Sequence, residues 1–265
     1  MHIGMKKISV LVLVLISFFG FSQTATIENK VFDRSITERF PNKLNSMFTA
    51  HGTYKRWDAM NQLSFDLLKK GGATETHLVD LKSRKTLISS SKFTIGFDGT
   101  AVWMNAEGKF PVERARFYHN LYFYFYAMPF VLGDPGITYL RIKDLSFENR
   151  TYSGYKIAYG NNVGDSPEDN YFVYIDKATH QMTWLGYTVT YGDDKPSTEI
   201  HYIKYTDWQK VNGLLLPKKL QWYDSENNLP VTSSNAAGFE NISVSEKMID
   251  ASRFVKPVDG LIGEK

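Results

Sequence analysis

Few residues of this sequence combine the type and the spacing that catalysis or metal binding needs. Five histidines follow the N-terminal segment, but none lies in a His-x-x-x-His or His-Glu pattern, which would place two zinc ligands on one face. They are His51, His77, His119, His180 and His201. The sequence also contains no Gly-x-Ser-x-Gly elbow, phosphate-binding loop or dinucleotide fingerprint. It therefore predicts no metal site, no cofactor and no local catalytic motif.

One group of carboxylates lies in the segment GDSPEDN, which contains Asp165, Glu168 and Asp169. Carboxylate oxygens are the ligands that calcium prefers. The segment lacks the alternating acidic spacing and the central glycine of a calcium loop. A solvated turn explains it better than a metal site.

The stretch best suited to ligand binding is aromatic. Residues 119–139, HNLYFYFYAMPFVLGDPGITY, contain five consecutive aromatic residues. As a strand, this stretch would be apolar on both faces and would need cover on both. As a helix, it would begin after Pro111 and end near Pro129. Because polar residues precede aromatic turns, we favour a helix from about Arg114 to Met128 that is buried on all sides.

Plain core packing is one interpretation of these aromatic residues, since Phe and Tyr are common in cores. Buried tyrosine hydroxyls need hydrogen-bond partners, however, and four tyrosines lie close together. Tyr118, Tyr122, Tyr124 and Tyr126 therefore favour a partly hydrated cavity. We predict that an apolar ligand contacts Phe123, Tyr124, Phe125 and Met128, with Trp103 and Trp184 as neighbours from the facing strands.

The rest of the chain has the pattern of consecutive antiparallel hairpins. Runs of β-branched and aromatic residues alternate with turn residues such as Asp98-Gly99 and Asn212-Gly213. Three hairpins are predicted, with strands at 93–97 and 101–104, at 171–175 and 181–191, and at 199–208 and 215–223. Further strands are predicted within 52–70 and 76–90. The pattern predicts one curved antiparallel sheet of about eight to eleven strands.

The N-terminus resembles an export signal. Lys6 and Lys7 precede an apolar run too short to span a bilayer comfortably, and small residues, Gly20 and Ser22, suit a peptidase. We expect residues 1–22 to be a cleaved signal peptide and residues 23–265, from Gln23, to form a single β domain. The alternative is an uncleaved membrane anchor. Periplasmic and secreted locations are both compatible with a cleaved signal.

A short helix is predicted after this segment. Ser35 and Glu38 have the spacing of a capping box, and Leu44, Met47 and Phe48 follow at helical spacing.

Composition excludes several classes of protein. The chain has no cysteine, so an exported form has no disulfide and no site for a lipid anchor on cysteine. Of 31 basic residues, 29 remain without Lys6 and Lys7, against 28 acidic residues, so the net charge is about +1. No basic stripe occurs, and we therefore predict no nucleic-acid binding.

The hairpins carry a resemblance to known families. The segments GFDGTAVWMN, the aromatic stretch with GDPG, YFVYIDKATHQMTWLGY and YTDWQKVNGLLLPKKLQWY resemble a family of uncharacterised exported bacterial envelope proteins. Their order is similar to that of the LolA-like outer-membrane lipoprotein carriers. This resemblance implies a half-open antiparallel β-barrel with helices on its concave face. It also implies transient contact with a membrane or with lipoproteins.

Three functions stay open at this point. We favour an envelope protein that binds or carries an apolar small molecule, such as a lipid or a lipoprotein acyl chain, in a half-barrel cavity. The second is a secreted enzyme with dispersed active-site residues, since strand-borne acids and histidines can converge without a linear motif. The third is a structural or partner-binding envelope protein.

Overall fold

The computed structural model describes residues 40–105, 107–159, 170–189 and 198–263. These residues belong to one unit, Arg34–Lys265. The predicted signal peptide, the Ser35 and Glu38 pattern and the carboxylates of GDSPEDN lie outside the described residues.

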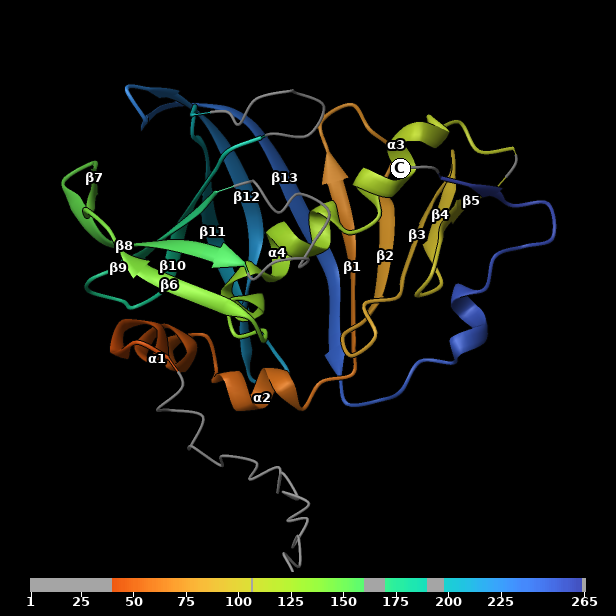
Figure 1. Ribbon diagram of the computed structural model, residues 1–265, viewed down its shortest axis with the longest axis horizontal. Coiled ribbons are helices and arrows are strands. Elements are labelled where there is room, and N and C mark those ends of the chain that lie inside the picture. The colour runs from red at the N-terminus through yellow and green to blue at the C-terminus, as the bar shows by residue number, and fades with distance from the viewer. Residues whose placement is uncertain (1–39, 106, 160–169, 190–197, 264–265) are drawn as a thin grey trace, which may run out of the picture. The chain divides into compact units, whose positions relative to one another are not determined.

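The described strands form one antiparallel sheet (Figure 1). Its strands are β1 (Gln62–Lys69), β2 (Glu75–Asp80), β3 (Thr86–Ser90), β4 (Thr94–Phe97), β5 (Val102–Met104), β6 (Ile137–Arg141), β7 (Leu145–Phe147), β8 (Arg150–Tyr159), β9 (Tyr171–Asp176), β10 (Met182–Tyr187), β11 (His201–Val211), β12 (Leu214–Glu226), β13 (Leu229–Ser245) and β14 (Leu261–Ile262). The order is β14-β5-β4-β3-β2-β1-β13-β12-β11-β10-β9-β8-β6, with β7 paired to β8. The end strands β14 and β6 do not pair with each other, so the described sheet is open.

The predicted fold class is confirmed, and so are its three hairpins, β4–β5, β9–β10 and β11–β12. The turn between β11 and β12 has positive φ at both Asn212 and Gly213, as a two-residue hairpin turn requires. The number of strands was predicted too low, because the described part of the sheet has fourteen. Strands of two or three residues, such as β14 and β7, are too short to show an alternating pattern.

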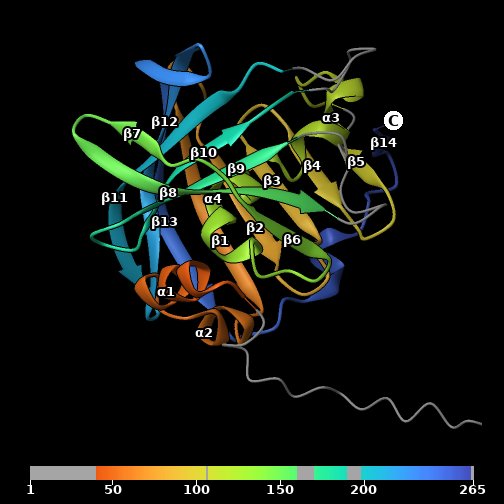
Figure 2. The same cartoon turned by 60° about the vertical axis from the view of Figure 1, so that its left-hand side comes forward.

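The aromatic stretch is helical and lies on the concave face of the sheet, as predicted (Figure 2). The single helix from Arg114 to Met128 was wrong, because two helices are present, α3 (Val112–Tyr118) and α4 (Leu121–Val131). The break lies at Asn120, whose side-chain oxygen accepts a hydrogen bond of 2.8 Å from the Thr86 hydroxyl of β3. This long-range bond fixes the change of direction, so α3 packs on β5 while α4 packs on β12.

Pro129 does not end α4 but lies inside it. A proline has no backbone N–H, so the carbonyl of Phe125, four residues earlier, loses its usual helical donor. The hydroxyl of Tyr205, from β11, donates to this carbonyl at 2.6 Å. The sheet thus supplies the hydrogen bond that the helix lacks, and α4 continues to Val131.

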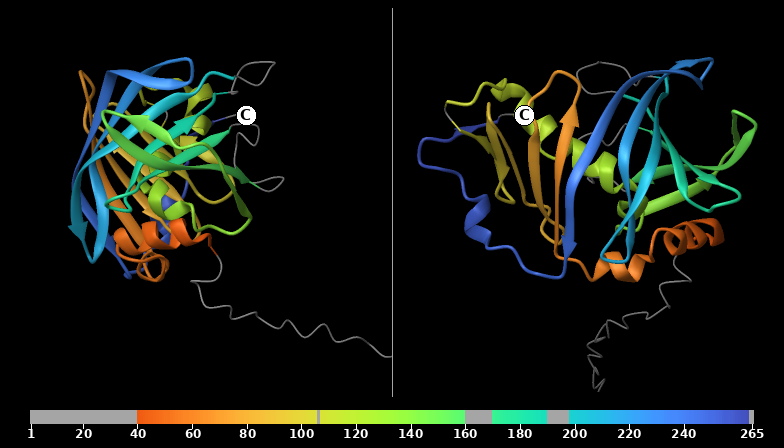
Figure 3. Two further views of the ribbon diagram at one scale, coloured as in Figure 1. Left: turned by 90° about the vertical axis from the view of Figure 1, so that its left-hand side faces the viewer. Right: turned by 180° about the vertical axis from the view of Figure 1, so that it is seen from behind.

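Two short helices pack at one end of the concave face (Figure 3). In α1 (Asn42–Ala50), the predicted apolar residues Leu44, Met47 and Phe48 are all buried. Helix α2 (Tyr54–Asp58) was not predicted, since its residues were taken as the beginning of a strand. Its Trp57 stacks on Phe130 of α4, with ring centroids 4.6 Å apart, and this tertiary contact outweighs the local strand pattern.

The turn between α1 and α2 fits closely against the β11–β12 turn. Gly52 has a φ of +100°, and a Cβ there would lie 2.1 Å from the carbonyl oxygen of Gly213. The preceding residue, His51, is fully buried. Its Nδ1 donates to the carbonyl of Leu215 at 3.0 Å, and its Nε2 accepts from the amide of Met182 at 3.1 Å. One neutral imidazole therefore joins α1 to β12 and β10.

No helix in the described ranges has the length and apolarity needed to cross a membrane.

The bond between Tyr205 and Phe125 can be tested by a double-mutant cycle. Tyr205→Phe leaves a buried carbonyl without its donor and should lower the free energy of unfolding by about 1–3 kcal/mol. Pro129→Ala restores a backbone N–H at that position, so Tyr205→Phe should cost much less in this background. Urea unfolding of the four proteins measures the coupling. Equal costs of Tyr205→Phe in both backgrounds would show that the hydroxyl does not replace the missing helical bond.

His51 should make stability depend on pH. Burial lowers its pKa from 6.5 to about 4. Between these values the unfolded chain binds a proton that the folded chain does not, so stability is full above pH 6.5 and falls as the pH drops towards 4. The loss is about 3 kcal/mol. His51→Gln should reduce the slope of unfolding free energy against pH in this window. Identical slopes for the unmodified protein and for His51→Gln would contradict this assignment.

Candidate ligand-binding site

A set of aromatic side chains lies at the end of the concave face opposite α1 and α2. Strand register places it there, because Lys69 pairs with Ala237 on β13 and Trp222 pairs with Asn235, at the other end of these strands from the Asn212-Gly213 turn. We call this set the aromatic rim. Its members are Tyr118, Tyr122, Phe125, Tyr187 and Trp222.

The rings of the aromatic rim form a continuous series. Tyr118 and Tyr122 are 5.7 Å apart between centroids, and Tyr122 is 6.4 Å from Trp222. Phe125 lies 6.1 Å from Trp222 and 5.2 Å from Tyr187. The indole N–H of Trp222 donates to the Tyr187 hydroxyl at 3.2 Å. Every member except Phe125 is partly exposed, so the series is a surface rather than closed core.

A polar cluster lies beside Tyr118 and Tyr122. The ammonium of Lys69 is 2.5 Å from Glu75 Oε1 and donates to the Tyr118 hydroxyl at 2.5 Å. Tyr118 in turn donates to Glu75 Oε2 at 2.6 Å. The ammonium also lies 5.0 Å and 5.3 Å from the ring centroids of Tyr118 and Tyr122, within cation–π range. The cluster thus ties α3 to β1 and β2.

His77 lies beneath this cluster. It is 1% exposed, stacks on Phe65 at 4.8 Å, and has its Nε2 3.4 Å from Glu75 Oε2, which is long for a hydrogen bond. Burial lowers the pKa of His77, although the nearby Glu75 opposes the shift. His77 is therefore neutral near pH 7 and adds no charge to the cluster.

The electrostatics of the cluster are those of a satisfied ion pair. Burial alone raises the pKa of Glu75, but its contacts with His77, Lys69 and Tyr118 outweigh burial and lower that pKa. Burial and the Glu75 carboxylate raise the pKa of Tyr118, and burial raises the pKa of Tyr122 to about 12. Near neutral pH, Glu75 is ionised and both tyrosines are protonated.

Only one of the predicted contact residues on α4 belongs to the aromatic rim. Phe125 belongs to the aromatic rim, and Tyr124 is partly buried with its ring 5.2 Å from Phe123. Phe123 and Met128 are 0% and 1% exposed, within the core around α4. Their contact with a ligand stays a prediction.

The two tryptophans lie apart from α4. Trp103 donates its indole N–H to the carbonyl of Phe254 at 2.9 Å, while its neighbours Val102 and Met104 pack in the cluster that contains Ala115 of α3. Trp184 packs in a separate cluster with Tyr202 and others, beside β7. Both indoles therefore face the opposite side of the sheet from α4. The structure does not bring them together with the α4 residues.

Sequence reasoning missed the polar side chains of the site, Lys69 and Glu75, and treated His77 as an isolated strand histidine. Strand alternation in β2 is the sequence feature that relates these residues, because Glu75, His77 and Val79 share one face. The structure shows that this face points inward. Two polar residues at inward positions of a strand indicate a buried polar cluster. Their partner Tyr118 is more than 40 residues away in sequence, so no local pattern identifies it.

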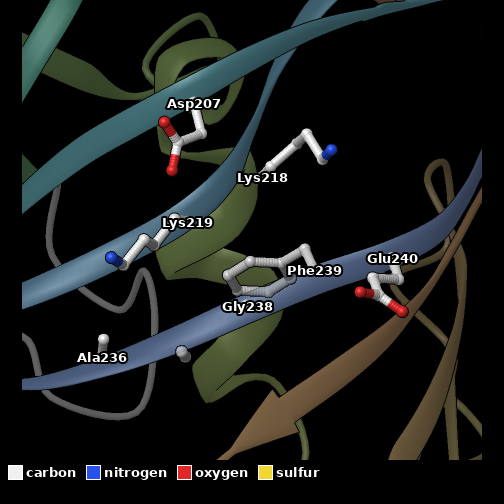
Figure 4. A pocket seen from close by; sticks show the side chains of 8 residues that line it. Asp207, Lys218, Lys219, Ala236, Gly238, Phe239 and Glu240 are labelled. Atoms are coloured by element: carbon white, nitrogen blue, oxygen red, sulfur yellow. The ribbon is translucent and has the colours of Figure 1, made fainter.

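A different hollow lies over β11, β12 and β13 and has a volume of about 260 Å³ (Figure 4). Its charged lining residues are Asp207, Lys218, Lys219 and Glu240. Two acidic and two basic side chains leave it without net charge. We see no chemistry in this hollow that selects a ligand.

The ion pair of the polar cluster predicts a stability effect. Glu75→Gln leaves the Lys69 ammonium without its counter-charge and should lower the free energy of unfolding at pH 7 by about 1–3 kcal/mol, since Lys69 is partly exposed. The folded-state pKa of Glu75 is lowered, so its contribution is present above pH 4.5 and is lost as the pH falls below it. The effect of Glu75→Gln should shrink accordingly in acid. The exposed Glu240→Gln is the control, and equal effects of both substitutions at pH 7 would contradict the ion-pair assignment.

Comparison with solved structures finds similar folds at low identity. A LolA superfamily protein from Nitrosomonas europaea has 7% identity and a TM-score of 0.44, covering 74% of this chain and 88% of that chain. A DUF1329 family protein from Desulfovibrio piger has 10% identity and a TM-score of 0.48, covering 81% and 98%. A putative outer membrane lipoprotein-sorting protein domain from Vibrio parahaemolyticus has 8% identity and a TM-score of 0.40, covering 72% and 89%. TM-scores below 0.5 support no conclusion about ligand or function.

Sequence comparison is more specific. A search of curated proteins gives no match. Residues 22–216 match the family described as "Family of unknown function (DUF6503)". This match covers well over half of the chain, and the protein therefore belongs to the DUF6503 family.

Proposed function

We propose that the protein is an exported envelope protein that binds an apolar ligand at the aromatic rim. Export is supported by the apolar run after Lys6 and Lys7, and the mature chain would begin near Gln23. A periplasmic or secreted location follows from this signal. Binding is the part of the proposal that depends on the structure.

One observation carries the proposal, namely a continuous series of aromatic rings in which every member except Phe125 is partly exposed. Each aromatic side chain contributes a large apolar area, so water contact along the whole series is unfavourable. Phe123 and Met128 are buried in the core around α4. In this arrangement an apolar ligand lies across the aromatic rim, and it reaches Phe123 or Met128 only if α4 moves.

Binding agrees better than catalysis with the state of the polar cluster. A general base or nucleophile needs a pKa near the working pH. Here the pKa of Glu75 is lowered and those of Tyr118 and Tyr122 are raised, so these three groups keep one protonation state near neutral pH. The groups beside the aromatic rim can hold a ligand, but they are poorly suited to move a proton.

Two adjacent residues on β12 provide a matched test. Trp222 belongs to the aromatic rim, whereas Tyr223 packs at 4.9 Å against Trp184 on the opposite face, and both are partly buried. Nile red, a neutral apolar probe, should bind the unmodified protein with a blue shift and increase of its emission. Trp222→Ala should weaken binding about fivefold to tenfold, as loss of one aromatic contact predicts, while Tyr223→Ala should leave it unchanged.

Unfolding midpoints with and without the probe separate binding from stability. A ligand-dependent rise in midpoint is expected for the unmodified protein and for Tyr223→Ala. Absence of Nile red binding, or an equal loss in both variants, would exclude the aromatic rim as the site. If Nile red binds as expected, native mass spectrometry of the protein isolated from its own cell envelope would identify the natural ligand.

A further inference from the structure

The polar cluster restricts the chemical class of ligand that the aromatic rim accepts. Glu75 is 5% exposed in its side chain, and both of its oxygens already have partners, Lys69 on Oε1 and Tyr118 on Oε2. Because it is buried and each oxygen faces a partner of the protein, this carboxylate is not accessible to a ligand cation. Glu75 is therefore not available as a hydrogen-bond acceptor for a ligand at the aromatic rim.

Lys69 has the opposite property. An ammonium group carries three N–H donors, and two of them are used by Glu75 and by the Tyr118 hydroxyl. The third has no hydrogen-bond partner among the described residues, and the Lys69 side chain is 28% exposed. Lys70, in the turn that follows β1, is exposed and adds a positive charge near the end of this strand. The available polar group beside the aromatic rim is thus a cationic donor.

The position of Lys69 also suits an amphiphile. Its ammonium lies over the rings of Tyr118 and Tyr122, and from Tyr122 the series continues through Trp222 to Phe125 and Tyr187. A ligand with an acidic head at Lys69 would place its chain along this series. The head gains a charge-assisted hydrogen bond, and the chain covers the exposed rings.

We propose that the ligand of the aromatic rim is a fatty acid, whose carboxylate accepts the third N–H of Lys69. This inference rests on the proposed function and adds the headgroup to it. A cationic or neutral head would find no equivalent partner among Lys69, Glu75 and Tyr118.

Displacement of Nile red by three amphiphiles with the same dodecyl chain tests the headgroup. They are dodecanoate and dodecyltrimethylammonium, used below their micelle concentrations, and dodecanol, used below its solubility limit. In the unmodified protein, dodecanoate should displace the probe at a concentration at least tenfold lower than the other two. Lys69→Met should abolish this preference, and Lys69→Arg should keep most of it. Lys218→Met, on an exposed side chain away from the aromatic rim, is the control and should behave as the unmodified protein.

Lys69→Met leaves Glu75 without its counter-charge, so the double variant Lys69→Met/Glu75→Gln serves where the single variant unfolds. The double variant removes both charges of the ion pair, and the protein should again lose its preference for dodecanoate. Equal displacement by dodecanoate and dodecanol in the unmodified protein, or a preference that survives in the double variant, overturns the fatty-acid assignment while leaving the proposed function intact. Failure of Nile red to bind the unmodified protein overturns both.

Discussion

Burial of α4 is the constraint on which the rest of the structure depends. Its residues from Phe125 to Val131 are all buried, so it has no polar face to turn towards water. An open sheet can cover such a helix only by curving around it. The two ends of the concave face must then be covered by other elements. Helices α1 and α2 cover one end, where Trp57 stacks on Phe130. The aromatic rim marks the other end, where Tyr118, Tyr122, Tyr187 and Trp222 are partly exposed.

Burying a helix completely also requires that its backbone be satisfied, and Pro129 makes this harder. The carbonyl of Phe125 faces a place where water cannot replace the missing N–H, so β11 must supply Tyr205 at that height. The same requirement applies to charge. Glu75 lies on the concave face, and it is tolerated there because Lys69 and Tyr118 both reach it. Tyr118 can do so because α3 turns away from α4 at Asn120.

Local chemistry was sufficient to predict the hairpins and the helical state of the aromatic stretch. Asn212 and Gly213 prefer positive φ whatever surrounds them, so their turn is visible in sequence. The direction of Trp103 was not visible in the same way. Alternation shows that Trp103 faces away from Val102 and Met104, but which face receives the helix depends on pairing between distant strands. The break at Asn120 and the cluster at Glu75 likewise depend on contacts between distant segments.

The two faces of the sheet differ in how a lysine meets their aromatic side chains, and this difference supports the proposed site at the aromatic rim. On the face opposite α4, the rings of Phe147, Trp184 and Tyr223 surround the ammonium of Lys204 at 5.2–5.9 Å. That lysine is an internal partner for those rings and is itself paired with Glu148. On the concave face, Lys69 reaches only the first two rings of the series. The rings of Trp222 and Tyr187, farther along, remain partly exposed, and an acyl chain extending from Lys69 would cover them.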